Sequence, residues 1–226
     1  MIAKHNEQGE ELLSVSRRAN GDGTLAVTLR TEAGEITGRY HPSAAGEGAV
    51  GIVWVLGTGG GVGGPAGGVY ERLARRLSPE GVASLELDYR RPGYLESCVR
   101  DALAGLSFLE SEGYERVILV GHAFGGAVAI RAAGASSAVI AVAALSSQLR
   151  GTEQVGKLRG RSLLLVHGED DEEQPVSGSR AVYERARDPK AIVTYPKGRH
   201  DLAACRDEVD RDLLAWLQKL THAPSR

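Results

Sequence analysis

Apolar runs alternate with helical periodicities along most of the chain. Several short runs consist almost entirely of apolar residues, as buried parallel strands do, and they span residues 50–56, 82–87, 117–120, 139–145, 162–166 and 191–195. Between them, apolar residues recur three and four positions apart and predict helices with one buried face, at residues 69–77, 95–109, 126 onward, 181–187 and 209–220. This alternation predicts an α/β protein with a mostly parallel, doubly wound sheet.

The first part of the chain follows a different pattern. Apolar and polar residues alternate at 12–18, 25–30 and 36–41, which predicts short strands. The stretches between them, Asn-Gly-Asp-Gly and Ala-Gly-Glu, have the composition of hairpin turns. We therefore expect an antiparallel meander within residues 1–48 that joins the same sheet, and a single domain over residues 1–226.

A tight turn follows the apolar run 117–120. Residues 121–125 read Gly-His-Ala-Phe-Gly, and a helix of small residues is predicted from Gly126. A strand, a turn and a helix in this order are the context of the nucleophile elbow, Gly-x-Ser-x-Gly. Gly121 and Gly125 are expected because neighbouring backbone crowds such a sharp, strained turn. The residue held above the sheet is Ala123, so the nucleophile position carries no nucleophile.

The turn and the elements around it resemble the α/β-hydrolase superfamily. Residues 121–126 look like the common Gly-His-Ser-x-Gly-Gly form with Ser replaced by Ala123. The resemblance runs from residue 50 to the last helix, and it implies the α/β-hydrolase fold of serine esterases and dienelactone hydrolases. Many members insert a helical cap after the strand that follows the elbow. Here only residues 146–161 join two predicted strands, which implies a fold without a cap and an open site.

The resemblance also implies an acid and a histidine that follow the elbow in that order. His-Gly-Glu-Asp-Asp at 167–171 looks like the acid turn of the family, and we take Asp171 as the acid, with Asp170 and Glu169 as rivals. Lys-Gly-Arg-His-Asp-Leu at 197–202 lies between the last strand and the last helix and resembles the histidine loop, with His200 as the general base.

Two other histidines and both cysteines could act as bases or nucleophiles, but we expect them to have structural roles. By the family pattern, His122 packs beside the nucleophile position and is not the base. His167 is expected to end a strand and support the acid turn. Cys98 and Cys205 sit at helical spacings without an elbow, so we interpret them as free packing thiols in a reducing compartment.

An oxyanion hole needs backbone N–H groups set where negative charge develops. The family pattern implies the N–H of Phe124 as one donor, since it follows the elbow position. The second donor is expected in the glycine-rich loop 57–68 after the strand that ends at Leu56. Either Thr58 or Gly59 fits that role.

The same glycine-rich loop allows a rival interpretation. Residues 59–64 match Gly-x-Gly-x-x-Gly after a strand, and the next strand carries Glu86 and Asp88, as in dinucleotide-binding proteins. Pro65 and the glycines at 67–68 delay the helix, which places its N-terminus poorly for a pyrophosphate. We keep dinucleotide binding as a remote alternative.

Two arginines follow the strand that carries these carboxylates. The loop Asp-Tyr-Arg-Arg-Pro-Gly at 88–93 resembles a family loop near the mouth of the active site. Arg90 or Arg91 could therefore hold an anionic group of a substrate. The alternative is an internal ion pair with Asp88.

Charge and composition narrow the class of partner. The formal net charge is −2, from 27 basic and 29 acidic residues, so no basic field is present to bind nucleic acid or an anionic membrane. Residues 1–10 lack the apolar core of a signal peptide, and no apolar run reaches membrane-spanning length. We expect a cytoplasmic protein that binds a small-molecule substrate without a cofactor or metal; the oligomeric state is left open.

Three functions are compatible with these residues. The favoured one is hydrolysis of a small carboxylic ester by a Ser-His-Asp mechanism, in a variant inactivated by alanine at the nucleophile position. The second is a natural, non-catalytic homologue that binds a small molecule. The third is an enzyme of this fold that needs no nucleophile, such as a cyclase or lyase. The first is favoured because Asp171, His200 and the elbow glycines occur together.

Overall fold

The computed structural model describes residues 11–45 and 50–222, which form one nine-stranded sheet in the order β1-β2-β3-β5-β4-β6-β7-β8-β9. The first ten residues, whose sequence lacks a signal-peptide core, lie outside the described residues. The strands are β1 (Ser14–Ala19), β2 (Leu25–Thr31), β3 (Gly34–His41), β4 (Val50–Val55), β5 (Ala83–Asp88), β6 (Arg116–His122), β7 (Val139–Leu145), β8 (Ser162–Gly168) and β9 (Lys190–Tyr195). The α-helices are α1 (Pro65–Leu77), α2 (Leu95–Ser111), α3 (Phe124–Ala135), α4 (Val176–Arg185) and α5 (Arg206–Thr221).

The sheet has the predicted mixture of strand directions. β1, β2 and β3 form an antiparallel meander, and β3 joins β5 in an antiparallel pair. From β5 to β9 every neighbouring pair is parallel. Both predictions, the parallel sheet and the antiparallel N-terminal strands, are confirmed. Because parallel strands all end at one edge, the loops after β4, β6, β8 and β9 meet there.

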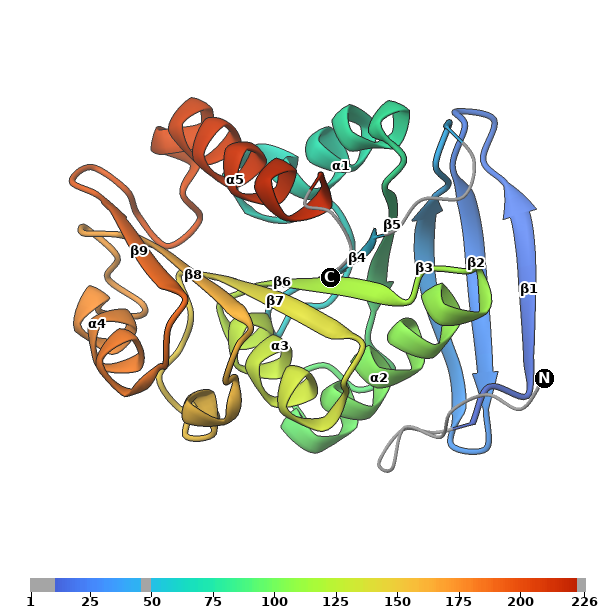
Figure 1. Ribbon diagram of the computed structural model, residues 1–226, viewed down its shortest axis with the longest axis horizontal. Coiled ribbons are helices and arrows are strands. Elements are labelled where there is room, and N and C mark those ends of the chain that lie inside the picture. The colour runs from blue at the N-terminus through green and yellow to red at the C-terminus, as the bar shows by residue number, and fades with distance from the viewer. Residues whose placement is uncertain (1–10, 46–49, 223–226) are drawn as a thin grey trace.

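Helices cover both faces of the sheet. Figure 1 shows α1 and α5 on one face and α2, α3 and α4 on the other. Alternate side chains of β4 divide between the two cores: Trp54 packs toward α1 and α5, and Val53 packs toward α2 and α3. Burial on both faces explains why these strands are apolar at nearly every position.

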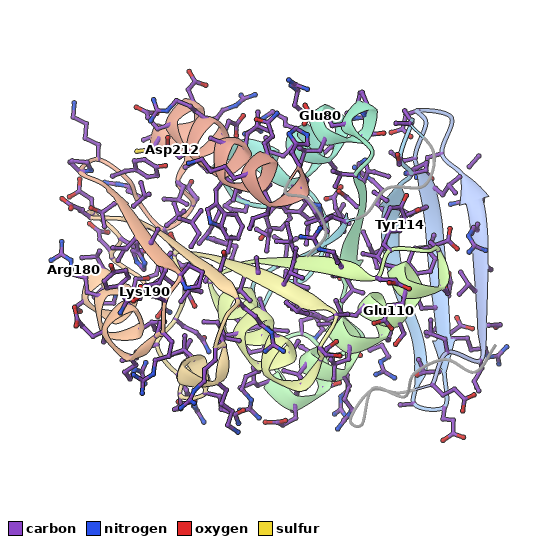
Figure 2. The ribbon with its side chains drawn as sticks, in the orientation of Figure 1. Glu80, Glu110, Tyr114, Arg180, Lys190 and Asp212 are labelled. Carbon is purple, nitrogen blue, oxygen red and sulfur yellow. The ribbon has the colours of Figure 1, made fainter. Side chains whose placement is uncertain are left out.

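Polar contacts at the margins of the sheet tie the helices to it. Asp212 on α5, labelled in Figure 2, accepts a 2.9 Å hydrogen bond from the hydroxyl of Tyr195 on β9. Lys190, also labelled there, donates to the carbonyl oxygen of Tyr183 on α4 at 2.8 Å and lies 4.4 Å from the centre of its ring. These contacts tie the two ends of β9 to α4 and α5.

One helix start agrees with its prediction, and one helix differs at both ends. The segment assigned to α1 begins at Pro65, but Ala66, Gly67 and Gly68 have positive φ, so the regular helix starts at Val69 as expected. The helix predicted over 181–187 begins earlier, at Val176, and ends at Arg185, because Ala186 is extended and buried. The other helices and strands agree with their predictions to within a few residues.

The connection between β7 and β8 contains only a short 3₁₀ helix, η2 (Val155–Lys157). No α-helical cap is inserted in this fully described connection, so the carboxyl edge of the sheet is left to short loops. Within the described ranges, no helix combines the length and the apolar character that a membrane span requires.

Candidate active site

The elbow lies between β6 and α3. Ala123 has φ 53° and ψ −117°, a conformation that is strained for a residue with a side chain. A Cβ on Gly121 would overlap the carbonyl oxygen of Gly125, and a Cβ on Gly125 would overlap the carbonyl oxygen of Leu56. Backbone crowding therefore requires glycine at both positions, for the reason given from the sequence.

This crowding predicts a large loss of stability on adding one methyl group. Gly121→Ala should lower the free energy of unfolding by more than about 3 kcal/mol, because rigid backbone must move to make room. Gly134→Ala in α3 is the matched control. The nearest atom to its new Cβ is Oε1 of Gln154 at 3.8 Å, so stability should stay equal or rise by up to about 1 kcal/mol. Urea unfolding measures both, and equal stabilities of the two variants would contradict the crowded turn.

Asp171 and His200 lie on the loops after β8 and β9 and face each other. The Nδ1 atom of His200 is 2.9 Å from Oδ2 of Asp171, and the two side chains are 16% and 0% exposed. Oδ1 of Asp171 accepts the backbone N–H groups of Glu173 and Gln174 at 2.9 and 2.8 Å. With a carboxylate at Asp171, His200 carries its proton on Nδ1, and its Nε2 is left as an acceptor.

Burial and hydrogen bonding act in opposite directions on Asp171. Burial raises its pKa, but the N–H of Gln174 and the ring of His200 outweigh burial, so the pKa falls below its ordinary value. Asp171 is therefore an ionised carboxylate at neutral pH. The rival Asp170 has an exposed side chain, and its backbone N–H donates to the carbonyl oxygen of Gly198 at 2.9 Å. Of these two aspartates, the structure brings Asp171 to His200.

His167 contacts both the turn after β8 and the carboxylate of Asp171. Its Nε2 lies 2.7 Å from the carbonyl oxygen of Gln174 and 3.2 Å from Oδ2 of Asp171, and its Nδ1 lies 2.7 Å from the hydroxyl of Ser179. Burial lowers the pKa of His167, which favours the neutral ring. The expectation that this histidine ends a strand beside the acid is confirmed.

A glycine contact that the sequence analysis missed brings the two loops together. A Cβ on Gly168, at the end of β8, would overlap the backbone of Gly198 in the histidine loop. The loops after β8 and β9 can approach this closely only because both positions lack a side chain. Two glycines 30 positions apart carry no local signal of this contact.

His122 connects the elbow to the histidine loop. Its Nε2–H donates to the carbonyl oxygen of His200 at 2.9 Å, and the two rings are 4.9 Å apart between centres. Burial, as the largest influence, lowers the pKa of His122 from 6.5 to about 4, so the ring is neutral at pH 7. The residue before Ala123 thus packs directly on His200.

A buried neutral histidine makes stability depend on pH in a definite direction. Between pH 6.5 and pH 4 the unfolded chain protonates His122 and the folded chain does not, so stability falls as the pH falls. His122→Gln keeps an N–H donor but cannot take up the extra proton. The substitution should therefore reduce the loss of unfolding free energy between pH 7 and pH 4 by on the order of 3 kcal/mol. Urea unfolding at both pH values tests this, with the exposed His222→Gln as control. The same pH dependence in His122→Gln and the unchanged chain would contradict it.

Phe124 and the start of the loop after β4 flank Ala123, where the oxyanion donors are expected. Phe124 is the first residue of α3, so its N–H has no acceptor within the helix. Gly57 reaches the elbow from the loop after β4: a Cβ built on it lies 3.6 Å from the Cβ of Ala123. The predicted candidates Thr58 and Gly59 follow in an exposed turn, which the N–H of Gly60 closes onto the carbonyl oxygen of Gly57 at 3.1 Å. Gly57, which the sequence did not single out, also lies against the elbow.

Hydrogen bonds to β5 occupy amides of the glycine-rich loop that a dinucleotide would need. The N–H of Gly61 donates to Asp88 at 2.7 Å, and the N–H of Gly63 donates to Glu86, which is itself paired with His41. The amides that would hold a pyrophosphate and the carboxylates that would hold a ribose are therefore engaged with one another. This arrangement argues against the dinucleotide alternative.

The two arginines after β5 have different surroundings. Arg90 pairs with buried Asp101 on α2, with Nε 2.7 Å from Oδ1, so the alternative of an ion pair with Asp88 named the wrong carboxylate. A substrate anion would have to compete with Asp101 for Arg90, which makes Arg91 the better of the two candidates. The guanidinium carbon of Arg91 lies 4.8 Å from the centre of the Tyr94 ring.

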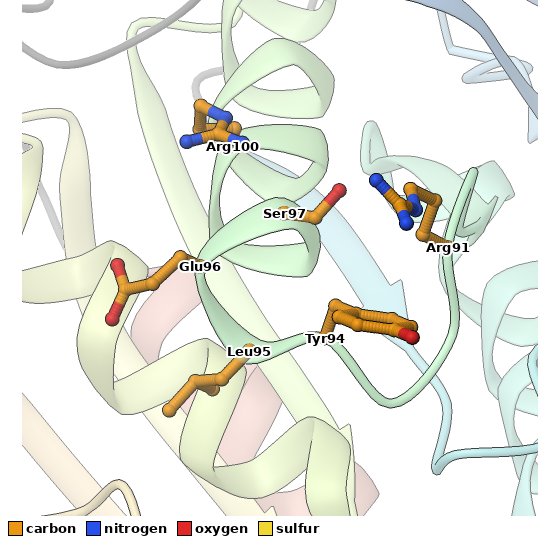
Figure 3. Close-up of a pocket in the computed structure, with 6 residues that line it drawn as sticks. All are labelled: Arg91, Tyr94, Leu95, Glu96, Ser97 and Arg100. Carbon is orange, nitrogen blue, oxygen red and sulfur yellow. The ribbon is translucent and has the colours of Figure 1, made fainter.

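Arg91 borders a cavity beside the start of α2. The cavity measures about 320 Å³, and Figure 3 shows the side chains that line it. These are Arg91, Tyr94, Leu95, Glu96, Ser97 and Arg100. A second space of about 390 Å³ shares Arg91, Ser97 and Arg100 with the first and extends to the turn between β2 and β3.

Neither cysteine has the surroundings of a reactive thiol. Cys98 and Cys205 are buried and free, and burial raises the pKa of the Cys98 thiol to about 11. Burial also raises the pKa of Cys205. Thiols in this state are poor nucleophiles at neutral pH. Across residues 11–45 and 50–222, His, Cys, Asp and Glu side chains form no group of three or more suited to a metal ion.

The sequence matches no protein-family model and no curated protein. The fold does match solved structures. Est1E from Butyrivibrio proteoclasticus superposes with a TM-score of 0.75 at 17% identity, over 86% of this chain and 98% of that one; another Est1E structure holds ferulic acid. Dienelactone hydrolase from Anabaena variabilis gives 0.73 at 15% identity, over 91% and 98%. A serine hydrolase without a lid from Xanthomonas campestris gives 0.74 at 18% identity, over 90% and 98%. This chain has the α/β-hydrolase fold.

Proposed function

We propose that the chain is a hydrolase of a small carboxylic ester or related acyl compound whose Ser-His-Asp triad has alanine at the nucleophile position. The observation that carries this proposal is the hydrogen bond between Asp171 and His200, beside a strained elbow at Ala123. A buried carboxylate that orients a histidine is the support a serine nucleophile needs. The likeness to esterases and to a dienelactone hydrolase supports the same class.

The chemistry follows from these positions once serine stands at 123. Nε2 of His200 takes the hydroxyl proton as Oγ attacks the ester carbonyl, and Asp171 stabilises the imidazolium that forms. The N–H of Phe124 and one N–H of the turn that starts at Gly57 hold the developing oxyanion. His200 then gives its proton to the leaving alcohol, and water hydrolyses the acyl-enzyme with His200 again as base. Alanine offers no lone pair for the first step, so the chain as it stands should bind such a substrate without acylation.

Exposed apolar side chains around this edge of the sheet support an apolar substrate. Among the described residues, Val62, Tyr94 and Leu149 are exposed large hydrophobic residues on the loops after β4, β5 and β7. Arg91, which stacks on Tyr94, is the proposed contact for an anionic group of the substrate. A phenolic acid such as the one bound to Est1E combines both features.

Ala123 itself favours a second candidate, a protein that binds a small acyl compound without turning it over. An enzyme that uses His200 as a base without a covalent step, such as a cyclase or lyase, is compatible with the same alanine. Hydrolysis is ranked first because neither alternative requires the oriented histidine, the buried acid and the crowded elbow together.

The experiment that tests the proposal is hydrolysis of p-nitrophenyl esters by the Ala123→Ser protein, from acetate to octanoate. Release of p-nitrophenol that depends on serine at 123 supports a hydrolase, and the preferred chain length reports the acyl site. A folded Ala123→Ser protein that hydrolyses none of these esters contradicts the proposal. In that case, calorimetric binding of ferulic acid by the unchanged chain would favour the binding protein.

A further inference from the structure

The glycine-rich loop is attached to β5 through two carboxylates. Glu86 and Asp88 are two positions apart on this strand, so both side chains leave the sheet on the same face. Oδ1 of Asp88 accepts the N–H of Gly61 at 2.7 Å, and Oε2 of Glu86 accepts the N–H of Gly63. Two carboxylates, two positions apart on the strand, therefore each accept one amide of the loop, and those amides are also two positions apart.

The loop needs such external support because of its composition. Gly60, Gly61, Gly63 and Gly64 have φ values of 65°, 92°, 101° and 77°, which glycine adopts without a steric penalty. Glycine also has the largest backbone freedom to lose on folding. A run of glycines has no side chains to pack, so hydrogen bonds from its amides must hold it in one conformation.

Glu86 is built as a fixed anchor. It is only 1% exposed, and a carboxylate in that position is stable only when its oxygens are hydrogen-bonded. Oε1 lies 2.7 Å from Nε2 of buried His41 on β3, which leaves Oε2 for Gly63. The contact with His41 thus orients the Glu86 carboxylate so that its second oxygen faces Gly63.

Asp88 holds the loop next to the turn that reaches the elbow. Gly61, which it binds, follows Gly60, and the N–H of Gly60 closes the turn onto the carbonyl oxygen of Gly57. A Cβ on Gly60 would lie 2.8 Å from Oδ1 of Asp88, so the carboxylate packs against this turn as well. Gly57 in turn approaches Ala123.

We propose that Asp88 and Glu86 are positioning residues that hold the turn 57–60 against the elbow, so that its oxyanion donor is fixed before substrate binds. A donor stabilises a transition state most when it needs no reorganisation at the moment of reaction. The two carboxylates act through the loop and not on the substrate. The inference rests on the proposed function, since the turn matters for catalysis only if an acyl oxygen is bound there.

The first test is amide hydrogen exchange, read by mass spectrometry, in the chain as it stands. Asp88→Ala should speed exchange in peptides covering 57–64 by about tenfold or more, because local opening no longer breaks the bond to the carboxylate. Peptides from α3 should be unchanged. Asp22→Ala removes an exposed carboxylate that pairs with Arg75 and not with the loop, and it should leave 57–64 unchanged. Glu86→Gln is a second variant and should loosen the same peptides.

The second test measures catalysis in the Ala123→Ser protein. Asp88→Ala should lower kcat by about tenfold or more and change KM by less than about threefold, since an oxyanion donor acts mainly in the transition state. Asp88→Asn keeps an acceptor oxygen and should recover part of the loss. A role in stability alone would leave kcat unchanged in the folded enzyme.

The outcomes separate this inference from the proposed function. Unchanged exchange of 57–64 in Asp88→Ala overturns the inference, whether or not Ala123→Ser is active. Loosened peptides with an unchanged kcat also overturn it. An inactive Ala123→Ser protein whose loop still loosens in Asp88→Ala overturns the proposed function and leaves Asp88 as an anchor of the loop.

Discussion

Exchange of Ala123 for serine is expected to raise kcat for p-nitrophenyl acetate by roughly 10⁴–10⁶-fold over the unchanged chain, the range that loss of a nucleophile spans in other triad enzymes. The backbone at 123 already has the strained elbow conformation, with φ 53°, so serine adds one oxygen and requires no new turn. The glycine at 57 leaves space beside the side chain. Steady-state kinetics of the two purified proteins measure the gain.

Two histidine variants control this result. His200→Ala in the Ala123→Ser protein should remove most of the gained activity, because no base then accepts the hydroxyl proton. His222→Ala changes an exposed histidine at the end of α5 and should leave kcat within about twofold. Activity that survives His200→Ala would mean that the gained hydrolysis does not use this histidine.

The second large effect concerns the acid. In the Ala123→Ser protein, Asp171→Asn should lower kcat by roughly 10⁴-fold, because asparagine no longer holds the proton on Nδ1 of His200 and cannot stabilise the imidazolium. Asp170→Asn is the matched control: the same exchange one residue away, on an exposed side chain, should change kcat by less than about threefold. Kinetics at pH 8 measure both. A larger loss in Asp170→Asn would reverse the assignment of the acid.

The fold was predictable because its strongest signals are local. Buried parallel strands are apolar at almost every position, and Val50–Val55 and Val139–Leu145 show this directly. Glycines mark the elbow because backbone meets backbone there. The boundaries that differ depend on conformations that the apolar pattern does not encode, such as the extended backbone at Ala186.

Contacts within the candidate site were predictable where a motif indicated them and not where segments distant in the sequence meet. Asp171 and His200 follow from chain order, and the structure places them in hydrogen-bond contact. The partner of Arg90 is Asp101, which lies on the next helix, and no pattern in the loop indicates it. Glu86 sits inside an apolar run, so its roles toward His41 and Gly63 become visible only when β3, β5 and the glycine-rich loop are brought together.

Asp171, His200 and the elbow are proposed to form a hydrolase site that lacks only its nucleophile. Intact mass after treatment with a fluorophosphonate probe tests it most directly, in three proteins: the chain as it stands, Ala123→Ser, and Ala123→Ser with His200→Ala. One adduct is expected on Ala123→Ser, mapped to residue 123, with no adduct on the unchanged chain and slow or no labelling without His200. A folded Ala123→Ser protein that takes no probe, or takes it at another residue, would contradict a hydrolase site at the elbow.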